Sequence, residues 1–206
     1  MSAHNESASE ANGDSSGTET RRIGRPPKVD EHGTPTRERL LNAAIDVCVE
    51  YGYAGVTLSE IARRADVSTP AVYSHFDGKA ELLITASKRE LEAIGGDRLP
   101  AALGLRNIAR QWLSPDFAKT RILVGELHRA AVRHPDVASL LDDWLLDNSV
   151  RFQEAAGMTL SQIKMFYLLI LGATNLESVS AVEVDQDVLE AEMITLIEGW
   201  LSDRYS

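Results

Sequence analysis

The sequence lacks the features that would place the protein in a membrane, an oxidising compartment or an enzyme class. No run of about 18 apolar residues occurs, which excludes a membrane-spanning protein. Cys48 is the only cysteine and lies between two valines, so we expect a buried thiol and no internal disulfide. With no apolar signal stretch near the N-terminus, we expect a cytoplasmic protein. Neither His128 nor His134 has a metal-ligating partner at a recognisable spacing, and no catalytic constellation stands out, so we expect no metal, no cofactor and no enzyme activity.

Positive charge is also scarce, and it is spread unevenly along the chain. The 206 residues include 21 Lys and Arg against 31 Asp and Glu, a formal net charge of -10 with a pI near 5.0. As an average, this charge argues against a nucleic-acid partner. By segment, however, residues 1–20 carry -4, residues 21–89 carry +2 and residues 90–206 carry -8. Such asymmetry indicates a nucleic-acid-facing segment joined to a part with another role.

Hydrophobic periodicity predicts helices only, after an N-terminal tail that lacks aromatic residues. Residues 1–35 are rich in Ser, Glu, Asn and Gly, so we expect this tail to be disordered. Beyond it, apolar residues recur at spacings of three and four, with no strand-like alternation. The predicted helices span about 36–51, 58–65, 69–76, 79–95, 100–113, 116–133, 136–156, 160–181 and 186–202. The predicted fold is therefore all-α, with a three-helix N-terminal domain over 36–83 and a helical bundle over 84–206.

Local signals mark the ends of the first helices. Gly52 lies just past the apolar stripe of the first helix and is expected to end it. Thr57 and Glu60 form a predicted capping box, in which Thr57 accepts a backbone N–H and Glu60 reaches back to the start of the helix. Residues 66–68 form a three-residue turn, and Ser68 is expected to cap the helix that follows.

Two short helices joined by a three-residue turn, and braced by a longer preceding helix, are typical of a helix-turn-helix. Residues 56–83 read VTLSEIARRADVSTPAVYSHFDGKAELL and closely resemble the DNA-binding signature of the TetR family of bacterial regulators. Residues 41–44 and 51–53 also resemble the first helix of that family. The resemblance covers about 36–83, and it implies a DNA-binding domain there with an effector-binding and dimerisation domain over 84–206. One departure is Asp66, which stands where the family usually has Gly. If the position requires positive φ, Asp there costs on the order of 1 kcal/mol, so we expect Asp66→Gly to be neutral or stabilising.

The resemblance implies that three residues clamp the DNA backbone. Tyr73, His75 and Lys79 match family positions with that role, and each side chain can donate a hydrogen bond to a phosphate. From spacing alone, two alternatives stay open: Tyr73 could pack beside Val72, and His75 could make a local hydrogen bond.

Further candidates lie at the starts of the two short helices. Residues 69–71 open the second one, where side chains point to base edges, and small apolar groups there suit a thymine methyl. Residues 57 and 59 match family positions near a phosphate and the groove edge. The predicted DNA-binding residues of this unit are Thr57, Ser59, Ser68, Thr69, Pro70, Ala71, Tyr73, Ser74, His75 and Lys79.

A basic arm precedes the first helix. Residues 21–28 carry four positive charges, and the central Gly-Arg-Pro resembles the core of an AT-hook. We expect Arg22, Arg25 and Lys28 to contact DNA, with Arg25 entering a narrow A·T minor groove. The alternative is a solvated charge run that aids solubility.

The bundle carries two further predictions. Residues 165–182 are apolar on almost every side, and with the last helix they resemble the pair through which TetR proteins dimerise, so we predict a homodimer through the last two helices. By the same resemblance, the other helices would enclose a pocket for an unknown small-molecule effector, although core packing or a solvated face is the alternative for each residue. The candidates are Trp112, Phe117, Arg121, Glu126, His128, Trp144, Phe152, Phe166, Asn175 and Glu177.

The sequence therefore predicts a homodimeric, sequence-specific transcription regulator that binds a palindromic double-stranded DNA operator, as a ligand-responsive repressor. The alternative is an architectural protein for A·T-rich DNA, in which the basic arm dominates binding and the bundle only dimerises.

Overall fold

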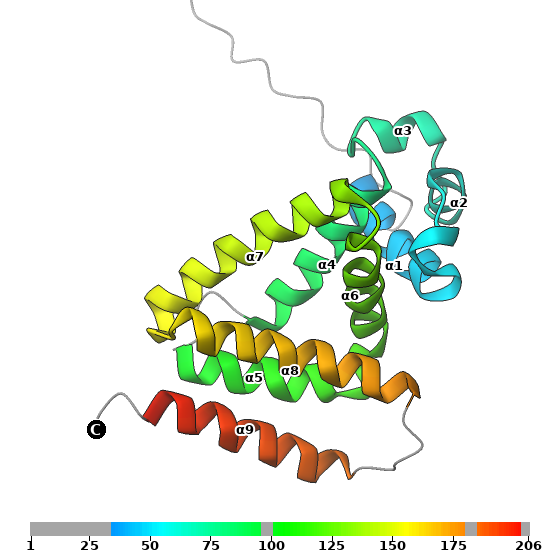
Figure 1. Cartoon of the computed structure of the whole chain (residues 1–206). Coiled ribbons are helices and arrows are strands. Elements are labelled where there is room, and N and C mark those ends of the chain that lie inside the picture. The colour runs from blue at the N-terminus through cyan, green and yellow to red at the C-terminus, as the bar shows by residue number, and fades with distance from the viewer. Residues whose placement is uncertain (1–33, 96–100, 180–184, 203–206) are drawn as a thin grey trace, which may run out of the picture.

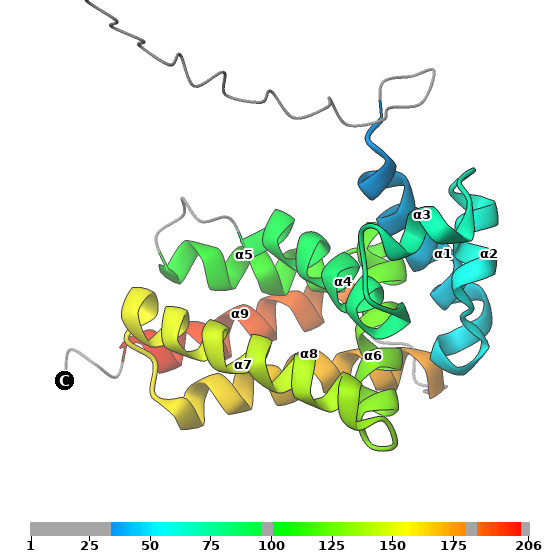
Figure 2. The same cartoon turned by 90° about the horizontal axis from the view of Figure 1, so that it is seen from above.

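A computed structural model describes residues 34–95, 101–179 and 185–202, and every regular element in these ranges is a helix (Figures 1 and 2). The predicted all-α fold is confirmed. The elements are α1 (Thr36–Gly55), α2 (Leu58–Arg64), α3 (Thr69–Tyr73), α4 (Lys79–Gly95), α5 (Ala101–Leu113), a 3-10 turn (Pro115–Phe117), α6 (Ala118–Ala131), α7 (Pro135–Ala156), α8 (Leu160–Val179) and α9 (Gln186–Ser202). None of the described helices is both long and apolar enough to span a membrane.

The first helix is interrupted at Gly52 rather than ended there. Gly52 has φ of 65° and ψ of 168°, which lie outside the helical region, and one more turn runs on to Gly55. The glycine therefore kinks α1, because only a residue without a Cβ adopts this conformation readily. The kink turns the chain toward Val56, which is buried, and so sets where α2 begins.

Two of the predicted helix caps differ from expectation. Thr57 does accept the Glu60 N–H at 3.2 Å, but the Glu60 carboxylate does not reach back, because it accepts hydrogen bonds from Arg63 and Arg64 instead. Ser68 occupies the cap position of α3 without a side-chain cap bond. The reason is that Pro70 has no N–H and the Ala71 N–H already donates to the Ser68 carbonyl at 2.9 Å.

The turn between α2 and α3 contains a residue with positive φ, the condition under which glycine would be favoured at this position. Asp66 is the only non-glycine described residue with positive φ, at 52°. The guanidinium of Arg39 on α1 holds this turn by donating to the Ala65 carbonyl at 2.9 Å and to the Asp66 carbonyl at 3.4 Å. The bond to Ala65 also places positive charge at the C-terminus of α2, where the helix dipole favours it.

The described residues form two hydrophobic cores. The first surrounds α1 and combines residues of α2–α4 with Leu123 and Leu127 of α6 and with Val137 and Leu141 of α7. The second lies among α5, α8 and α9 and contains Trp112, Phe166, Ile170, Met193 and Ile197. The predicted domain boundary after residue 83 falls inside α4, which continues to Gly95. The N-terminal unit and the bundle therefore share the first core.

The strained turn generates a stability prediction. Asp66 is exposed, and no donor in the described part of the chain makes a hydrogen bond to its carboxylate. Glycine adopts the same left-handed conformation without a Cβ, so Asp66→Gly removes a steric cost on the order of 1 kcal/mol. We expect an unchanged or higher melting temperature in thermal unfolding. The control Asp66→Ala puts a residue that tolerates the left-handed region less well at this position, so its free energy of unfolding should fall by about 1 kcal/mol and its melting temperature should fall with it. A lower melting temperature for Asp66→Gly would show that the carboxylate makes a stabilising bond.

Candidate nucleic-acid interface

The helix-turn-helix exposes polar side chains of α2, of α3 and of the segment after α3, which we call the exposed polar row. Two residues of α3 and the segment after it, Val72 and Phe76, are buried in the first core and hold this segment in place. The residues between and around them face outward, and Tyr73 is 60% exposed, so it does not pack beside Val72. The exposed candidates are Thr57, Ser59, Ser68, Pro70, Tyr73, Ser74 and His75, whereas Thr69, Ala71 and Lys79 are half-buried.

Local hydrogen bonds restrain some of these side chains. The Thr57 and Ser59 hydroxyls lie 3.2 Å apart at the start of α2, and the Ser74 hydroxyl donates to the Ala71 carbonyl at 2.7 Å. A hydroxyl has two acceptor lone pairs as well as its proton, so each group keeps capacity for a further partner.

Lys79 holds the start of α4 against the end of α1. Its ammonium donates to the Tyr53 carbonyl at 3.1 Å and to the Val56 carbonyl at 3.3 Å, and it lies 4.5 Å from the centre of the Tyr53 ring. An ammonium has three donors, so one remains for a phosphate. The geometry therefore gives Lys79 a positioning role beside its predicted contact with DNA.

Arg37 is a basic residue of this surface that sequence reasoning missed. Arg37 is exposed, and its guanidinium lies 5.3 Å from the centre of the ring of Phe76, the residue that follows His75 in the sequence. The start of α1 therefore lies beside the end of α3, as both views show (Figures 1 and 2). The predicted arm residues Arg22, Arg25 and Lys28 lie outside the described residues. No local motif marks Arg37, because its position depends on how α1 packs.

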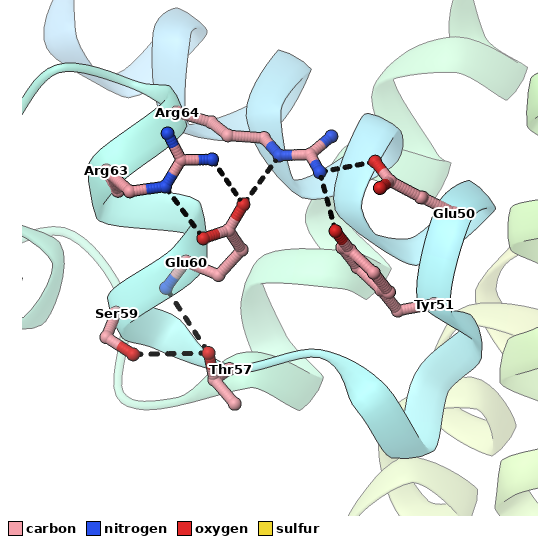
Figure 3. Close-up of polar contacts among 7 residues, drawn as sticks. All are labelled: Glu50, Tyr51, Thr57, Ser59, Glu60, Arg63 and Arg64. Atoms are coloured by element: carbon pink, nitrogen blue, oxygen red, sulfur yellow. Dashed lines mark hydrogen bonds and ion pairs between the residues drawn. The ribbon is translucent and has the colours of Figure 1, made fainter.

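A second missed group surrounds Glu60 (Figure 3). Arg63 donates to both Glu60 carboxylate oxygens, at 2.7 and 2.8 Å, and Arg64 donates to one of them at 2.9 Å. Arg64 also pairs with Glu50 and lies over the Tyr51 ring, 5.5 Å from its centre. These contacts fasten α2 to the end of α1.

The charges in this group cancel. Hydrogen bonds from Arg63 and then Arg64 lower the pKa of Glu60 to about 2, so the carboxylate is ionised at neutral pH. Two acidic and two basic side chains therefore leave no net charge, although the group adjoins Thr57 and Ser59. Residues 36–89 contain seven basic and seven acidic residues. Two of these basic residues, Arg63 and Arg64, are paired with acids in this group.

The predicted effector residues fall into separate places. The second core contains Trp112, Phe117 and Phe166, and Phe152 adjoins it with its ring 6.1 Å from that of Phe166. Trp144 packs against the first core and is not brought together with them.

The polar effector candidates are engaged in hydrogen bonds. The Trp112 indole donates to the Ile170 carbonyl at 3.0 Å, and the buried Arg121 guanidinium donates to the Trp112 and Ser114 carbonyls. His128 Nδ1 lies 2.9 Å from the Val124 carbonyl oxygen, and burial lowers the pKa of its ring. These contacts hold the bundle together.

The three remaining polar candidates are Glu126 on α6 and Asn175 and Glu177 on α8. Glu126 and Asn175 both bind Arg129, at 2.6 and 3.1 Å respectively. The side chain of Glu177 lies outside the described residues.

Comparisons with known proteins agree with this geometry. Residues 40–86 match the model of a family described as bacterial regulatory proteins, tetR family. Over 99 residues the chain is 32% identical to the HTH-type transcriptional repressor KstR of Mycolicibacterium smegmatis, a match that covers 48% of this chain and 45% of KstR. The match therefore spans less than half the length of that relative.

Solved structures extend the likeness to the bundle. A transcriptional regulator from Rhodococcus sp. Rha1 has a TM-score of 0.62 at 23% identity, over 81% of this chain and 96% of that one. The regulator FadR from Bacillus subtilis, solved in complex with stearoyl-CoA, has a TM-score of 0.54 at 18% identity, over 78% and 96%. At these identities the likeness establishes the fold of both parts.

Proposed function

Because the chain belongs to the TetR family of bacterial regulatory proteins, we propose that it is a sequence-specific transcription regulator that binds a palindromic DNA operator. The observation that carries this proposal is the exposed polar row on α2 and α3, held outward by the buried Val72 and Phe76. The proposal assigns no catalysis, metal or cofactor to the chain. DNA in a bacterial cell lies in the cytoplasm, so the proposal carries that location with it.

In this proposal the exposed row divides into two kinds of contact. Tyr73 and His75 donate to phosphates, and Lys79 adds its third donor. Residues 69–71 enter the major groove, where Pro70 and Ala71 offer apolar contact to a thymine methyl. Thr57 and Ser59, at the start of α2, approach the backbone and the groove edge.

We propose a homodimer through the outer faces of α8 and α9, which lie at the end of the molecule away from α2 and α3 (Figure 1). Large apolar side chains are exposed on both helices, including Met165 and Leu168 on α8 and Val188 and Leu196 on α9. A Cβ added at Gly172 or Gly199 would meet no atom within 4 Å, so a second helix has room to approach. Two-fold symmetry would place two recognition helices about 34 Å apart, or a multiple of that distance.

We propose that an effector binds in the second core and releases the operator, which makes the chain a ligand-responsive repressor. The aromatic group of Trp112, Phe152 and Phe166 supports an apolar ligand at this place. Coupling requires that the ligand bind one conformation of the dimer more tightly than the DNA-competent one. Of the polar candidates, Glu126 and Asn175 both bind Arg129 and are not members of this core.

The architectural alternative is favoured by one observation. Residues 36–89, which contain the helix-turn-helix, have no net charge, whereas the arm that precedes α1 is basic and α1 begins beside the end of α3. An arm-dominated protein would bind A·T-rich DNA through phosphates and the minor groove, without regard to a palindrome.

Binding to a selected operator tests the main proposal. The operator is identified by selection from random duplexes, and the affinities of Tyr73→Phe and Tyr51→Phe are compared by fluorescence anisotropy. Loss of a hydrogen bond to a phosphate should weaken binding by Tyr73→Phe about tenfold or more, with the salt dependence unchanged because the hydroxyl is uncharged. Tyr51→Phe makes the same chemical change at a tyrosine that is 50% exposed outside α3, and it should bind as wild type. Equal affinities of the two variants would contradict the role of Tyr73.

Binding to two duplexes of different sequence distinguishes the sequence-specific regulator from the architectural alternative. A sequence-specific regulator should prefer the selected palindrome over a shuffled duplex of equal A·T content, and removal of residues 1–30 should leave that preference. If the arm contacts phosphates, the same truncation should flatten the slope of log K against log salt by about 0.9 per lost contact. Equal binding of palindrome and shuffled duplex would favour the architectural alternative.

Sedimentation tests the proposed interface. Leu168→Glu places an unpaired carboxylate on the outer face of α8, so we expect dimerisation weakened by about two orders of magnitude in analytical ultracentrifugation. The matched control is Leu146→Glu on α7, where the leucine is 65% exposed, and it should remain dimeric. A wild-type monomer, or a fully dimeric Leu168→Glu, would overturn the interface.

A further inference from the structure

Glu126 on α6 makes hydrogen bonds to two different parts of the molecule through its two carboxylate oxygens. Oε2 accepts the Tyr53 N–H at 2.7 Å, at the end of α1. Oε1 accepts from Arg129 at 2.6 Å, and the other amino group of Arg129 donates to the Asn175 side-chain oxygen at 3.1 Å. One series of bonds therefore leads from α8, across α6, to the helix that carries the helix-turn-helix. We call Asn175, Arg129, Glu126 and Tyr53 the interdomain relay.

The break in α1 is what admits the carboxylate. Gly52 has φ of 65°, and a Cβ built there would lie 2.9 Å from Glu126 Oε2. A side chain at this position would both strain the backbone and displace the carboxylate. The glycine therefore serves two purposes: it kinks α1 and it leaves room for Glu126 beside the Tyr53 N–H.

Beyond Tyr53, the relay reaches the surface proposed to contact DNA. The Tyr53 carbonyl accepts from the Lys79 ammonium, which also lies over the Tyr53 ring. Lys79 begins α4, four residues after His75. A shift of Tyr53 relative to α6 would therefore move the lysine that anchors the end of the recognition segment.

At its other end, the relay starts on the proposed dimer face. Asn175 is exposed and follows Leu168 and Gly172 along one face of α8, because positions seven and three residues apart share a face. Its amide nitrogen donates to the Leu171 carbonyl at 2.8 Å, which directs its oxygen toward Arg129. Close packing supports the crossing, since a Cβ at Gly125 would lie 3.0 Å from Thr174 Cγ2.

The Glu126 carboxylate is charged in this position. Partial burial favours the neutral acid, but the hydrogen bonds from Arg129 and from the Tyr53 N–H outweigh it and hold the pKa below the ordinary value. A charged acceptor makes stronger hydrogen bonds than a neutral one, so both connections depend on the carboxylate.

We propose that Glu126 is a positioning residue for DNA binding, which fixes the helix-turn-helix on the bundle and transmits changes at α8 to Lys79. This inference rests on the proposed function. Because coupling is reciprocal, events at α8 alter the start of α4, and operator binding at α3 and α4 alters α8.

The first test needs no DNA and uses the full chain. Hydrogen exchange is measured for peptides covering residues 53–56 and 79–82 in wild type, Glu126→Gln, Asn175→Ala and Asn148→Ala. Asn148 is a matched control on α7, because its amide also donates to the carbonyl four residues earlier, that of Trp144, without touching Arg129. We expect these peptides to exchange several-fold faster in Glu126→Gln and Asn175→Ala than in wild type, and to exchange at the wild-type rate in Asn148→Ala. Equal behaviour of the two asparagine variants would overturn the relay.

The second test uses the selected operator and a second control. Asp46 pairs with Lys119 at 2.6 Å and also joins α1 to α6, outside the relay, so Asp46→Asn removes an interdomain contact of another kind. We expect Glu126→Gln to bind the operator about tenfold more weakly and to lose the protection that DNA confers on α8, while Asp46→Asn keeps both.

The outcomes separate the two proposals. Glu126→Gln that melts lower but binds the operator as wild type, with DNA still protecting α8, would make the carboxylate merely structural. If the wild-type chain selects no operator, the proposed function fails, whereas the exchange test without DNA still decides whether the relay exists.

Discussion

The packing of α6 against α1 is the constraint on which the rest of the structure depends. Leu40, Leu41 and Val47 of α1 are fully buried, in the same core as Leu123 and Leu127 of α6. Complete burial of one such side chain contributes about 1.5–3 kcal/mol to the free energy of folding. Separating the two helices would expose several of these side chains to water and lose their contributions together. The recognition unit therefore shares a core with the bundle, and a displacement of α6 cannot leave α1 unaffected.

Charged side chains have a different role, which is to select how neighbouring helices are arranged. Arg63 and Arg64 are neutralised by Glu60 and Glu50 in the recognition unit, and in the bundle two ion pairs join α5 to α9: Arg106 with Glu198 and Arg110 with Glu190. Exposed pairs of this kind contribute only about 0–1 kcal/mol each, so they select an arrangement more than they stabilise it. The recognition surface consequently relies on hydroxyls, Tyr73, His75 and a few single charges.

Features governed by neighbours in sequence were predictable. The helix-turn-helix, the bond from the Glu60 N–H to Thr57 and the positive φ of Asp66 all follow from short-range rules of capping and turn geometry. The predicted cap hydrogen bonds of Glu60 and Ser68 were wrong because other groups bind the donors or acceptors that those bonds required. Glu60 turned to two arginines one helical turn away, and Ser68 lost its cap partners to a proline and to its own carbonyl.

By itself, the sequence determined an all-helical chain with a TetR-like recognition motif, because helical periodicity and turn residues act over a few positions. Only the tertiary structure decided that Arg37 lies over the Phe76 ring, that Trp144 packs against the first core, and that Lys79 binds the end of α1. It also brought Glu126 to the Tyr53 N–H across 73 positions. Such contacts depend on how whole helices cross, and a helix crossing is set by the summed packing of many side chains rather than by any local pattern.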